Sequence, residues 1–187
     1  MITFIAPAFN EDIKTIPFVG SMLAQKDPRW KAIIYHNGVN PEMRSWVSSL
    51  NDPRLTYRES DTNTGYWGCF NRIDALSKVD TEYVVQTSIQ DYFTNNAVGD
   101  ILQSEDFPDI IYWNSIHHYF EMNELVSELE PARVDWGNFA IRTSIAKQVG
   151  INHPTEFMAD WLFVKDCLDS GLIHQRGKIN KILTVHN

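Results

Sequence analysis

Apolar runs and helical patterns alternate along the first half of the chain. Runs rich in apolar and β-branched residues predict strands at 2–9, 31–35, 54–58 and 82–87. Between them, apolar residues recur three and four positions apart, which predicts helices at 11–26, 40–50 and 66–78. Strands that alternate with helices favour a mostly parallel sheet with right-handed crossovers.

The second half of the chain has a mixed pattern. It predicts strands at 109–113, 136–142 and 179–185, and helices at 143–149, with Thr143 as the cap, and at 158–170. Residues 117–134 are polar, and we predict that they are rich in loops. We therefore expect one α/β domain over residues 1–187, with a regular front half at 1–93 and a mixed back half at 94–187.

Proline marks several of the expected junctions. Asp27-Pro28 and Asp52-Pro53 each stand where a helix must stop and a strand begin, because the residue before proline is pushed out of the helical region. Asn40-Pro41 predicts a helix start, with Asn as the N-cap and Pro in the first turn.

Composition excludes several classes of protein. Of the 187 residues, 43% are hydrophobic and 21% are charged, which is typical of a globular protein and not of a disordered or coiled-coil chain. A net charge of −8 argues against nucleic acid or an anionic membrane as the main partner. No run predicts a transmembrane segment or a signal peptide. Cys69 and Cys167 fit a reduced core, so we expect a cytoplasmic protein.

Polar residues follow three of the predicted strands. The segments 7–12, 36–38 and 88–92 come directly after the first, second and fourth strands. In open α/β sheets, ligands bind beyond the carboxyl ends of the strands. We therefore expect these three loops to form a binding site at one edge of the sheet.

Common catalytic signatures are absent from the sequence. It contains no GxGxxG, GxxxxGK[ST] or GxSxG, so it predicts neither a phosphate-binding glycine loop nor a serine nucleophile elbow. His117 and His118 are adjacent, and adjacent residues do not share one face of a strand or helix. We interpret this pair as part of a polar loop.

Six segments, in order, resemble glycosyltransferase family 2. They are APAFN, IIYHNG, RLTYRESDTNTGYWGCFNR, EYVVQTSIQDYF, WGNFAIRTSIAKQVG and MADWLFVKDCL. The resemblance covers nearly the whole chain and implies a GT-A-like, three-layer fold around a mostly parallel mixed sheet. It also implies an enzyme of the hexosyltransferase type. Such an enzyme moves a sugar, with inversion, from a nucleotide-diphosphate sugar bound by residues 1–93 to an acceptor hydroxyl bound by residues 94–187.

Donor contacts are implied for the front half. Pro7, Ala8 and Phe9 match the segment that cradles the base and ribose in the family. Asn37 stands where the family has an Asp that accepts the N3–H of uracil, and because an amide both accepts and donates, uridine is not forced. Arg72 matches a segment that faces the donor, and either a diphosphate contact or a helix-face salt bridge fits it.

The metal motif departs from the family pattern. Where the family has D-x-D-D, this chain has Ser88-Ile89-Gln90-Asp91. Mg²⁺ and Mn²⁺ prefer oxygen ligands, and Mg²⁺ often takes one or two carboxylates plus phosphate oxygens. The resemblance therefore implies that Asp91, with Gln90, holds a divalent metal and the diphosphate. It makes His186 either a further ligand or part of a frayed tail.

Asp160 is the candidate catalytic base. It matches the second position of the family's Glu-Asp pair, and an inverting transfer needs a base for the acceptor hydroxyl. Asp135 and Glu156 are weaker candidates for an acid. Acceptor contacts are expected from Trp136, Gly137, Asn138 and Trp161.

Two other functions compete with sugar transfer. The alternative is a catalytically impaired GT-A fold that binds a nucleotide-sugar or glycan, because the metal motif is degenerate. A nucleotidyltransferase lacks support, because its glycine- and basic-rich loop is absent. The expected partners are a nucleotide-diphosphate sugar and a glycan or other hydroxyl acceptor, which a homo-oligomer partner or a second protein would help to hold.

Overall fold

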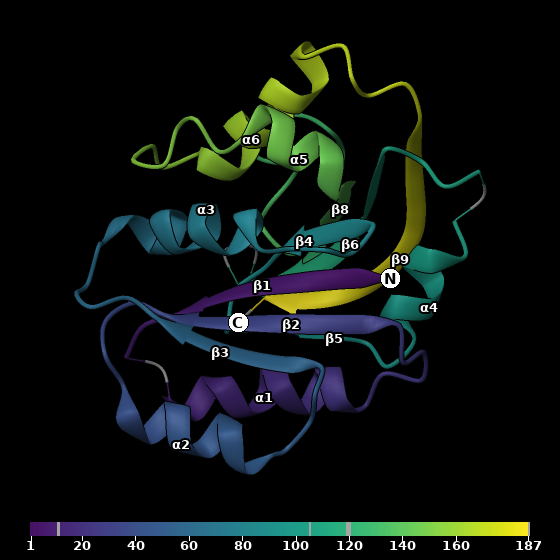
Figure 1. The fold of residues 1–187 in the computed structure, drawn as a ribbon. Coiled ribbons are helices and arrows are strands. Elements are labelled where there is room, and N and C mark those ends of the chain that lie inside the picture. Colours follow the sequence, from purple (N-terminus) through teal and green to yellow (C-terminus); the bar gives the residue numbers. More distant parts are fainter. Residues whose placement is uncertain (11, 105, 119–120, 187) are drawn as a thin grey trace.

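A nine-stranded sheet runs through the molecule, and helices cover both of its faces (Figure 1). The structure is a computed structural model that describes residues 1–10, 12–104, 106–118 and 121–186, and of residues 12–16 the backbone alone. The strands are β1 (Ile2–Ala8), β2 (Trp30–His36), β3 (Leu55–Glu59), β4 (Tyr83–Gln86), β5 (Asp91–Phe93), β6 (Ile110–His117), β7 (Asn123–Leu125), β8 (Phe139–Arg142) and β9 (Arg176–His186). The helices are α1 (Asp12–Leu23), α2 (Pro41–Ser49), the 3-10 turn η1 (Tyr66–Gly68), α3 (Cys69–Ser77), α4 (Ala97–Leu102), α5 (Thr143–Val149) and α6 (Ala159–Asp169).

Parallel pairing is concentrated in the front half of the sheet. The strand order is β3-β2-β1-β4-β8-β6-β9-β5, with β7 paired to β6. The strands β3, β2, β1 and β4 are parallel neighbours, whereas β8 is antiparallel to both β4 and β6. The last strand, β9, lies between β6 and β5. The α/β class is as predicted, but the sheet is parallel mainly in its first half.

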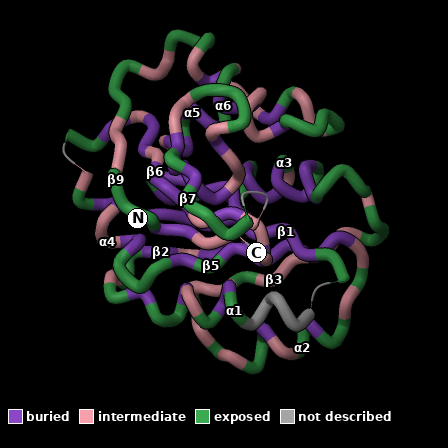
Figure 2. Tube along the Cα trace, turned by 180° about the vertical axis from the view of Figure 1, so that it is seen from behind, coloured by how far each residue is buried: buried purple, intermediate pink, exposed green. Residues whose placement is uncertain are grey.

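Each face of the sheet has its own hydrophobic core. Helices α1 and α2 cover one face, and α3, α5 and α6 cover the other (Figure 1). Adjacent residues of a strand point to opposite faces, so Phe4 packs in the first core and Ile5 in the second. The central strands are buried along most of their length, whereas the loops are exposed (Figure 2). Cys69 and Cys167 are both buried and unpaired, as predicted.

Short polar contacts fix the predicted junctions. The carboxylates of Asp27 and Asp52 accept hydrogen bonds from the backbone N–H groups of Arg29 and Arg54, at 3.0 and 2.9 Å. The side chain of Asn40 accepts from the backbone N–H of Met43 at 2.9 Å and caps α2. These turns end each helix where the following strand must begin.

Some expected elements differ in the structure. A proline inside the predicted helix 11–26 favours a later start near Pro17, but α1 begins at Asp12 and runs through Pro17. Thr143 is the first residue of α5 and makes no capping hydrogen bond. The elements β5, α4 and β7 were not predicted, because segments of three to six residues are too short to show a period.

The carboxyl ends of β1, β2 and β4 meet at one edge, as the sequence predicts. The backbone N–H of Asn37 donates to the carbonyl of Ala8 at 2.8 Å, and that of Ile89 donates to the carbonyl of Pro7 at 3.2 Å. The loops after these three strands are therefore neighbours at this edge.

Candidate active site

A row of polar residues crosses three strands at the carboxyl end of β9. In the register of the sheet, His186 pairs with Asp91 of β5 on one side and with His117 of β6 on the other. Asp91 is fully buried, and His117 is 4% exposed. The tertiary structure therefore places three titratable side chains from distant parts of the chain next to one another.

Asp91 is held by a full set of donors. Its Oδ2 accepts from the Thr87 hydroxyl at 2.5 Å and from the Ser88 backbone N–H at 2.7 Å. Its Oδ1 pairs with Nδ1 of His186. Gln90 is half-buried in the turn before Asp91, and its backbone N–H donates to Ser88 Oγ at 3.2 Å. The turn that replaces the family's metal motif therefore orients one carboxylate toward β9.

Gly137 lies directly against Asp91. Its φ is +99°, and a Cβ built on it would lie 2.6 Å from Asp91 Oδ2. Its carbonyl accepts from the Thr184 hydroxyl at 2.7 Å, and the same hydroxyl accepts from the indole of Trp113 at 2.7 Å. Only a glycine fits this close approach. We expected Gly137 to contact the acceptor, but its contacts support the buried carboxylate.

Asp135 and Asp160 are neighbouring carboxyls that act on each other electrostatically. Burial together with the negative charge of Asp135 raises the pKa of Asp160 to about 7. Burial also acts to raise the pKa of Asp135, but the hydrogen bond from His117 and the charges of His186 and His117 outweigh it and lower that pKa. A carboxyl with a pKa near neutral can accept a proton at physiological pH.

Arg72 is a buried cation among these acids. It is 3% exposed, and its guanidinium lies 4.9 Å from the centre of the Trp136 ring. Burial lowers its pKa to about 10, while the charges of the nearby Asp91, Asp135 and Asp160 oppose this shift, so it stays protonated at neutral pH. Its Nε and Nη1 have no hydrogen-bond partner among the described residues. A buried guanidinium with unpaired N–H groups can receive an anion.

His117 and His118 belong to this site, which corrects our interpretation of them as a polar loop. Their rings stack with that of His186, with centroids 4.5 to 5.1 Å apart. One ligand nitrogen of each ring lies within 4.8 Å of the others. The Nε2 of His117 also donates to Asp135 Oδ2 at 3.0 Å. We had reasoned that adjacent residues point to opposite faces of a strand. That reasoning does not apply to this pair, because β6 ends at His117 and His118 lies beyond it.

The residues present fit a divalent metal ion. Three imidazoles lie together, which is a nitrogen donor set that divalent transition metals accept, and the carboxylate of Asp91 pairs with one of them. His186 and His117 each hydrogen-bond to a carboxylate, as metal-binding histidines do. His186 lies at the end of an ordered strand, so the frayed-tail alternative is not what the structure shows.

At the edge formed by β1, β2 and β4, the side-chain amide of Asn37 already makes hydrogen bonds within the protein. Its Oδ1 accepts from the N–H of Thr64 at 2.8 Å and from its hydroxyl at 3.0 Å, and its Nδ2 donates to Asn63 Oδ1 at 2.7 Å. The amide therefore holds the loop that contains residues 60–65, and reading a base would require that loop to move. Of the other expected donor contacts, Ala8 is 3% exposed and Phe9 is 45% exposed. Pro7 would lie 2.5 Å from a Cβ at Gly68.

Most of the residues expected to contact the acceptor make packing contacts or hydrogen bonds inside the protein. Asn138 is 1% exposed; its Oδ1 accepts from the Asp135 backbone N–H at 3.0 Å and its Nδ2 donates to Ser127 at 2.9 Å. The half-buried rings of Trp136 and Trp161 pack against the second core. These contacts give Asn138 a positioning role for Asp135. Glu156 is exposed and is not part of the half-buried pair formed by Asp135 and Asp160.

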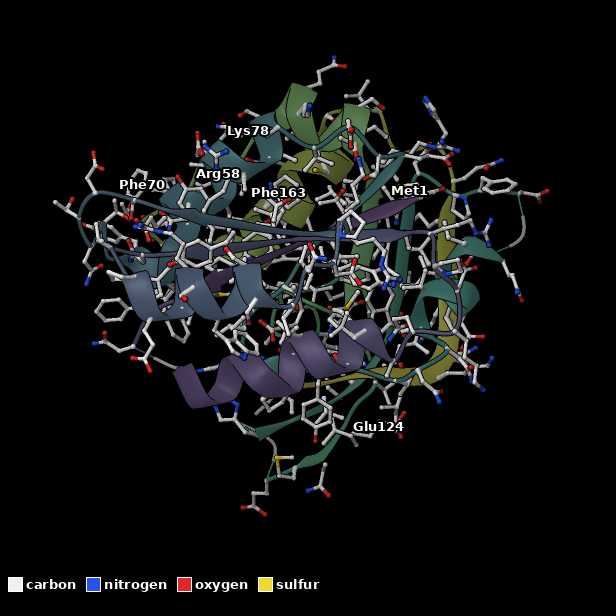
Figure 3. The ribbon with its side chains drawn as sticks, turned by 60° about the horizontal axis from the view of Figure 1, so that its bottom comes forward. Met1, Arg58, Phe70, Lys78, Glu124 and Phe163 are labelled. Atoms are coloured by element: carbon white, nitrogen blue, oxygen red, sulfur yellow. The ribbon has the colours of Figure 1, made fainter. Side chains whose placement is uncertain are left out.

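Exposed aromatic rings border the site near Asp160. Trp67, in η1, and Phe157, in the loop before α6, are 65% and 79% exposed, and their rings meet edge to face at 5.9 Å. Phe70 lies at the periphery of the molecule, whereas Phe163 of α6 lies among packed side chains (Figure 3). Trp67 has φ +51°, and the whole run from Gly65 to Gly68 has positive φ. Such strain is costly, and it clusters at binding sites.

Sequence comparison finds one curated relative. WcaA of Escherichia coli (strain K12), described as "Putative colanic acid biosynthesis glycosyl transferase", is 29% identical over 101 residues. The match covers 53% of this chain and 36% of WcaA, so the chain spans about a third of that protein. No protein-family model matches the chain.

Solved structures share the fold across nearly the whole chain. TarS of S. aureus superposes with a TM-score of 0.80 at 16% identity, over 100% of this chain and 36% of TarS. TarS 1–349 in complex with UDP-GlcNAc gives 0.80 at 15% identity, over 98% of this chain and 57% of that one. The mannosyltransferase PcManGT from Pyrobaculum calidifontis, in complex with GDP-Man and Mn²⁺, gives 0.73 at 13% identity, over 99% and 56%. The chain therefore has the α/β fold of these glycosyltransferases, as the resemblance implied.

Among the described residues, no helix combines the length and the apolar character needed to span a bilayer.

Proposed function

We propose that this chain is an inverting glycosyltransferase that moves a sugar from a nucleotide-diphosphate sugar to an acceptor hydroxyl. The observation that carries the proposal is the cluster of the carboxyls Asp160 and Asp135 near the buried guanidinium of Arg72, in which burial and the charge of Asp135 raise the pKa of Asp160. The fold shared with TarS and PcManGT, whose structures contain UDP-GlcNAc and GDP-Man, supports a nucleotide-sugar as the donor. The similarity to WcaA supports the same class of reaction.

The donor would lie across the edge formed by β1, β2 and β4. Its nucleoside would rest on Pro7, Ala8 and Phe9, and its diphosphate would lie near Arg72 and Asp91. The unpaired Nε and Nη1 of Arg72 would donate to phosphate oxygens, which are the acceptors that a planar guanidinium matches best. A divalent metal held by Asp91 and His186 would act as a Lewis acid toward the leaving diphosphate.

Asp160 would act as the base. As the acceptor oxygen bonds to the anomeric carbon, its proton would pass to the Asp160 carboxylate. The bond from that carbon to the diphosphate oxygen breaks, and the electron pair leaves with the nucleoside diphosphate. The hydrogen bond from His117 keeps Asp135 ionised, and the charge of Asp135 raises the proton affinity of Asp160. The matched pKa is the reason why a carboxyl serves as base near pH 7.

The acceptor would meet the exposed pair Trp67 and Phe157. Phe157 precedes Asp160 by three residues, so a hydroxyl compound that rests on this pair would lie beside the base. Aromatic faces present apolar area to the C–H face of a sugar ring, and their exposure leaves them open to it. Of the acceptor residues that the resemblance implies, Trp136 and Trp161 would stay behind this surface and support it. A homo-oligomer partner would complete the acceptor site, and the free thiols Cys69 and Cys167 support a cytoplasmic setting.

Nucleotide-dependent stabilisation tests the proposal. The melting temperature would be measured with UDP, GDP, CDP, ADP and TDP, each with Mn²⁺, Mg²⁺ or no metal. A ligand at 100 times its Kd contributes about 2.7 kcal/mol, which for a chain of this size is a rise of about 5–10 °C. Hydrolysis of the matching nucleotide-sugar would then be compared between the wild type and Asp160→Asn. A rise without any hydrolysis or transfer favours the inactive binding module, and no rise with any nucleotide contradicts the donor site.

A further inference from the structure

Three histidine rings meet where two parallel strands end. His117 is the last residue of β6, His186 is the last of β9, and His118 follows β6. One ligand nitrogen from each lies within 4.8 Å of the others. Four-coordinate zinc, at 2.0–2.1 Å from each nitrogen, holds its ligands about 3.4 Å apart. The rings therefore need only to turn out of their parallel stacks to converge on one ion.

Carboxylates fix two of the three rings. Nδ1 of His186 pairs with Asp91, and Nε2 of His117 donates to Asp135 at 3.0 Å. A histidine held in this way coordinates through its other nitrogen, and the carboxylate fixes its tautomer and strengthens it as a ligand. Asp91 is itself fixed by Thr87 and Ser88, so the partner of His186 is also held in place.

We propose that His117, His118 and His186, the last held in place by Asp91, bind one divalent transition-metal ion in preference to Mg²⁺. Imidazole suits zinc, cobalt and nickel, whereas Mg²⁺ demands oxygen ligands and loses its water reluctantly. Ser88 and Gln90 stand where the family has carboxylates, and His117 at the end of β6 and His118 just beyond it lie beside His186, so this site favours another class of metal. This inference deepens the proposed function by naming the ion that would hold the diphosphate, but the binding itself does not depend on sugar transfer.

Cobalt titration tests the site directly. Protein without a polyhistidine tag would be dialysed against Co²⁺ without nucleotide, and the visible absorption and the metal content would be measured. We expect one Co²⁺ per chain, displacement by an equal concentration of Zn²⁺, and no displacement by a 100-fold excess of Mg²⁺. Asp135→Asn, which removes the partner of His117, should weaken binding about 10–100-fold. Removing a ligand, with His118→Ala or His186→Ala, should weaken it at least as much.

His174→Ala is the matched control. This exposed histidine precedes β9, at the opposite end of the strand from His186, and the change should leave the Co²⁺ affinity as in the wild type. Circular dichroism and melting temperature show that each variant is folded. Absence of stoichiometric Co²⁺ in the wild type, displacement by Mg²⁺, or equal loss in His174→Ala would overturn the proposal. Cobalt binding with no nucleotide effect would keep this metal site and contradict the glycosyltransferase proposal. Stabilisation by a nucleotide that occurs with Mg²⁺ and with no transition metal would support the glycosyltransferase proposal and contradict this metal site.

Discussion

The neighbouring carboxyls of Asp135 and Asp160 act on each other electrostatically, and their pKa values move in opposite directions. That of Asp160 rises to about 7 and that of Asp135 falls. The pair lies between a buried cation, Arg72, and the histidine His117. Asp160 therefore takes up and releases a proton near neutral pH, at the position where the proposed reaction needs a base.

Replacing Asp160 separates activity from stability. Asp160→Asn should lower the transfer rate by about 10²–10⁴-fold, which is the contribution of a general base. The melting temperature at pH 8 should rise by a few degrees, because the amide removes a buried negative charge beside Asp135. The control is Asp169→Asn at the end of α6, where the carboxylate is 63% exposed and pairs with Lys165. A variant that retains full transfer would contradict the assignment of the base.

The contribution of Asp160 to the free energy of unfolding should fall as the pH rises. The folded-state pKa of Asp160, about 7, lies above its value in the unfolded chain, so the folded state holds a proton that the unfolded state has released. This contribution to the free energy of unfolding is present below about pH 4 and is lost as the pH rises through 7. The transfer rate should rise over the upper part of the same range. Denaturant unfolding of the wild type and Asp160→Asn between pH 5 and 8 measures the difference, and a difference that grows toward pH 5 in favour of Asp160→Asn refutes it.

Arg72 should matter for both the diphosphate and the base. Arg72→Met should weaken nucleoside-diphosphate binding about 10–150-fold, because hydrogen bonds to charged groups contribute about 1.5–3 kcal/mol. It should also raise the apparent pKa of the rate, because the positive charge of Arg72 lowers the pKa of Asp160. Arg29→Met, which breaks an exposed ion pair with Asp27, is the control. Unchanged nucleotide affinity together with an unchanged pH profile would show that Arg72 is structural.

Gly137 tests the packing around Asp91. Gly137→Ala should destabilise the fold by about 1–3 kcal/mol, because its φ of +99° and the Asp91 carboxylate 2.6 Å away both oppose a Cβ. Metal binding should weaken with it. Gly20→Ala in α1 is the matched control, since a Cβ there meets nothing within 4 Å, and it should stabilise the fold by about 0.4–1 kcal/mol. Thermal unfolding of both variants measures the two changes in stability. Equal changes in Gly137→Ala and Gly20→Ala would contradict the close approach of Gly137 to Asp91.

Trp67 tests the acceptor surface. Trp67→Ala should raise the KM for the acceptor while it leaves the melting temperature within a few degrees of the wild type, because the ring is 65% exposed. Phe107→Ala is the matched control, since Phe107 is also an exposed aromatic residue with positive φ. Steady-state kinetics at saturating donor measures the effect. If Phe107→Ala changes the acceptor KM as much, the surface at Trp67 and Phe157 is not the acceptor site.

The order of the long elements, and the edge at which they converge, follow from local patterns in the sequence. The apolar periods of β1, β2 and β4 and the turns at Asp27 and Asp52 are local signals, so they can be recognised without tertiary contacts. The same local order places Pro7, Asn37 and Ser88 at one edge. Asp91, Asp160, Arg72 and His186 were also named from the sequence as candidates.

Which of these side chains touch depends on contacts between elements that are distant in the chain. The placement of β9 between β6 and β5 pairs His186 with Asp91 and His117, which lie 95 and 69 positions away in the chain. It turned a supposed polar loop into a histidine cluster, and it committed Asn37 and Asn138 to internal hydrogen bonds. Periodicity reports on neighbours within one strand or helix. The register between strands depends on packing across the whole sheet, and the chemistry of this site depends on that register.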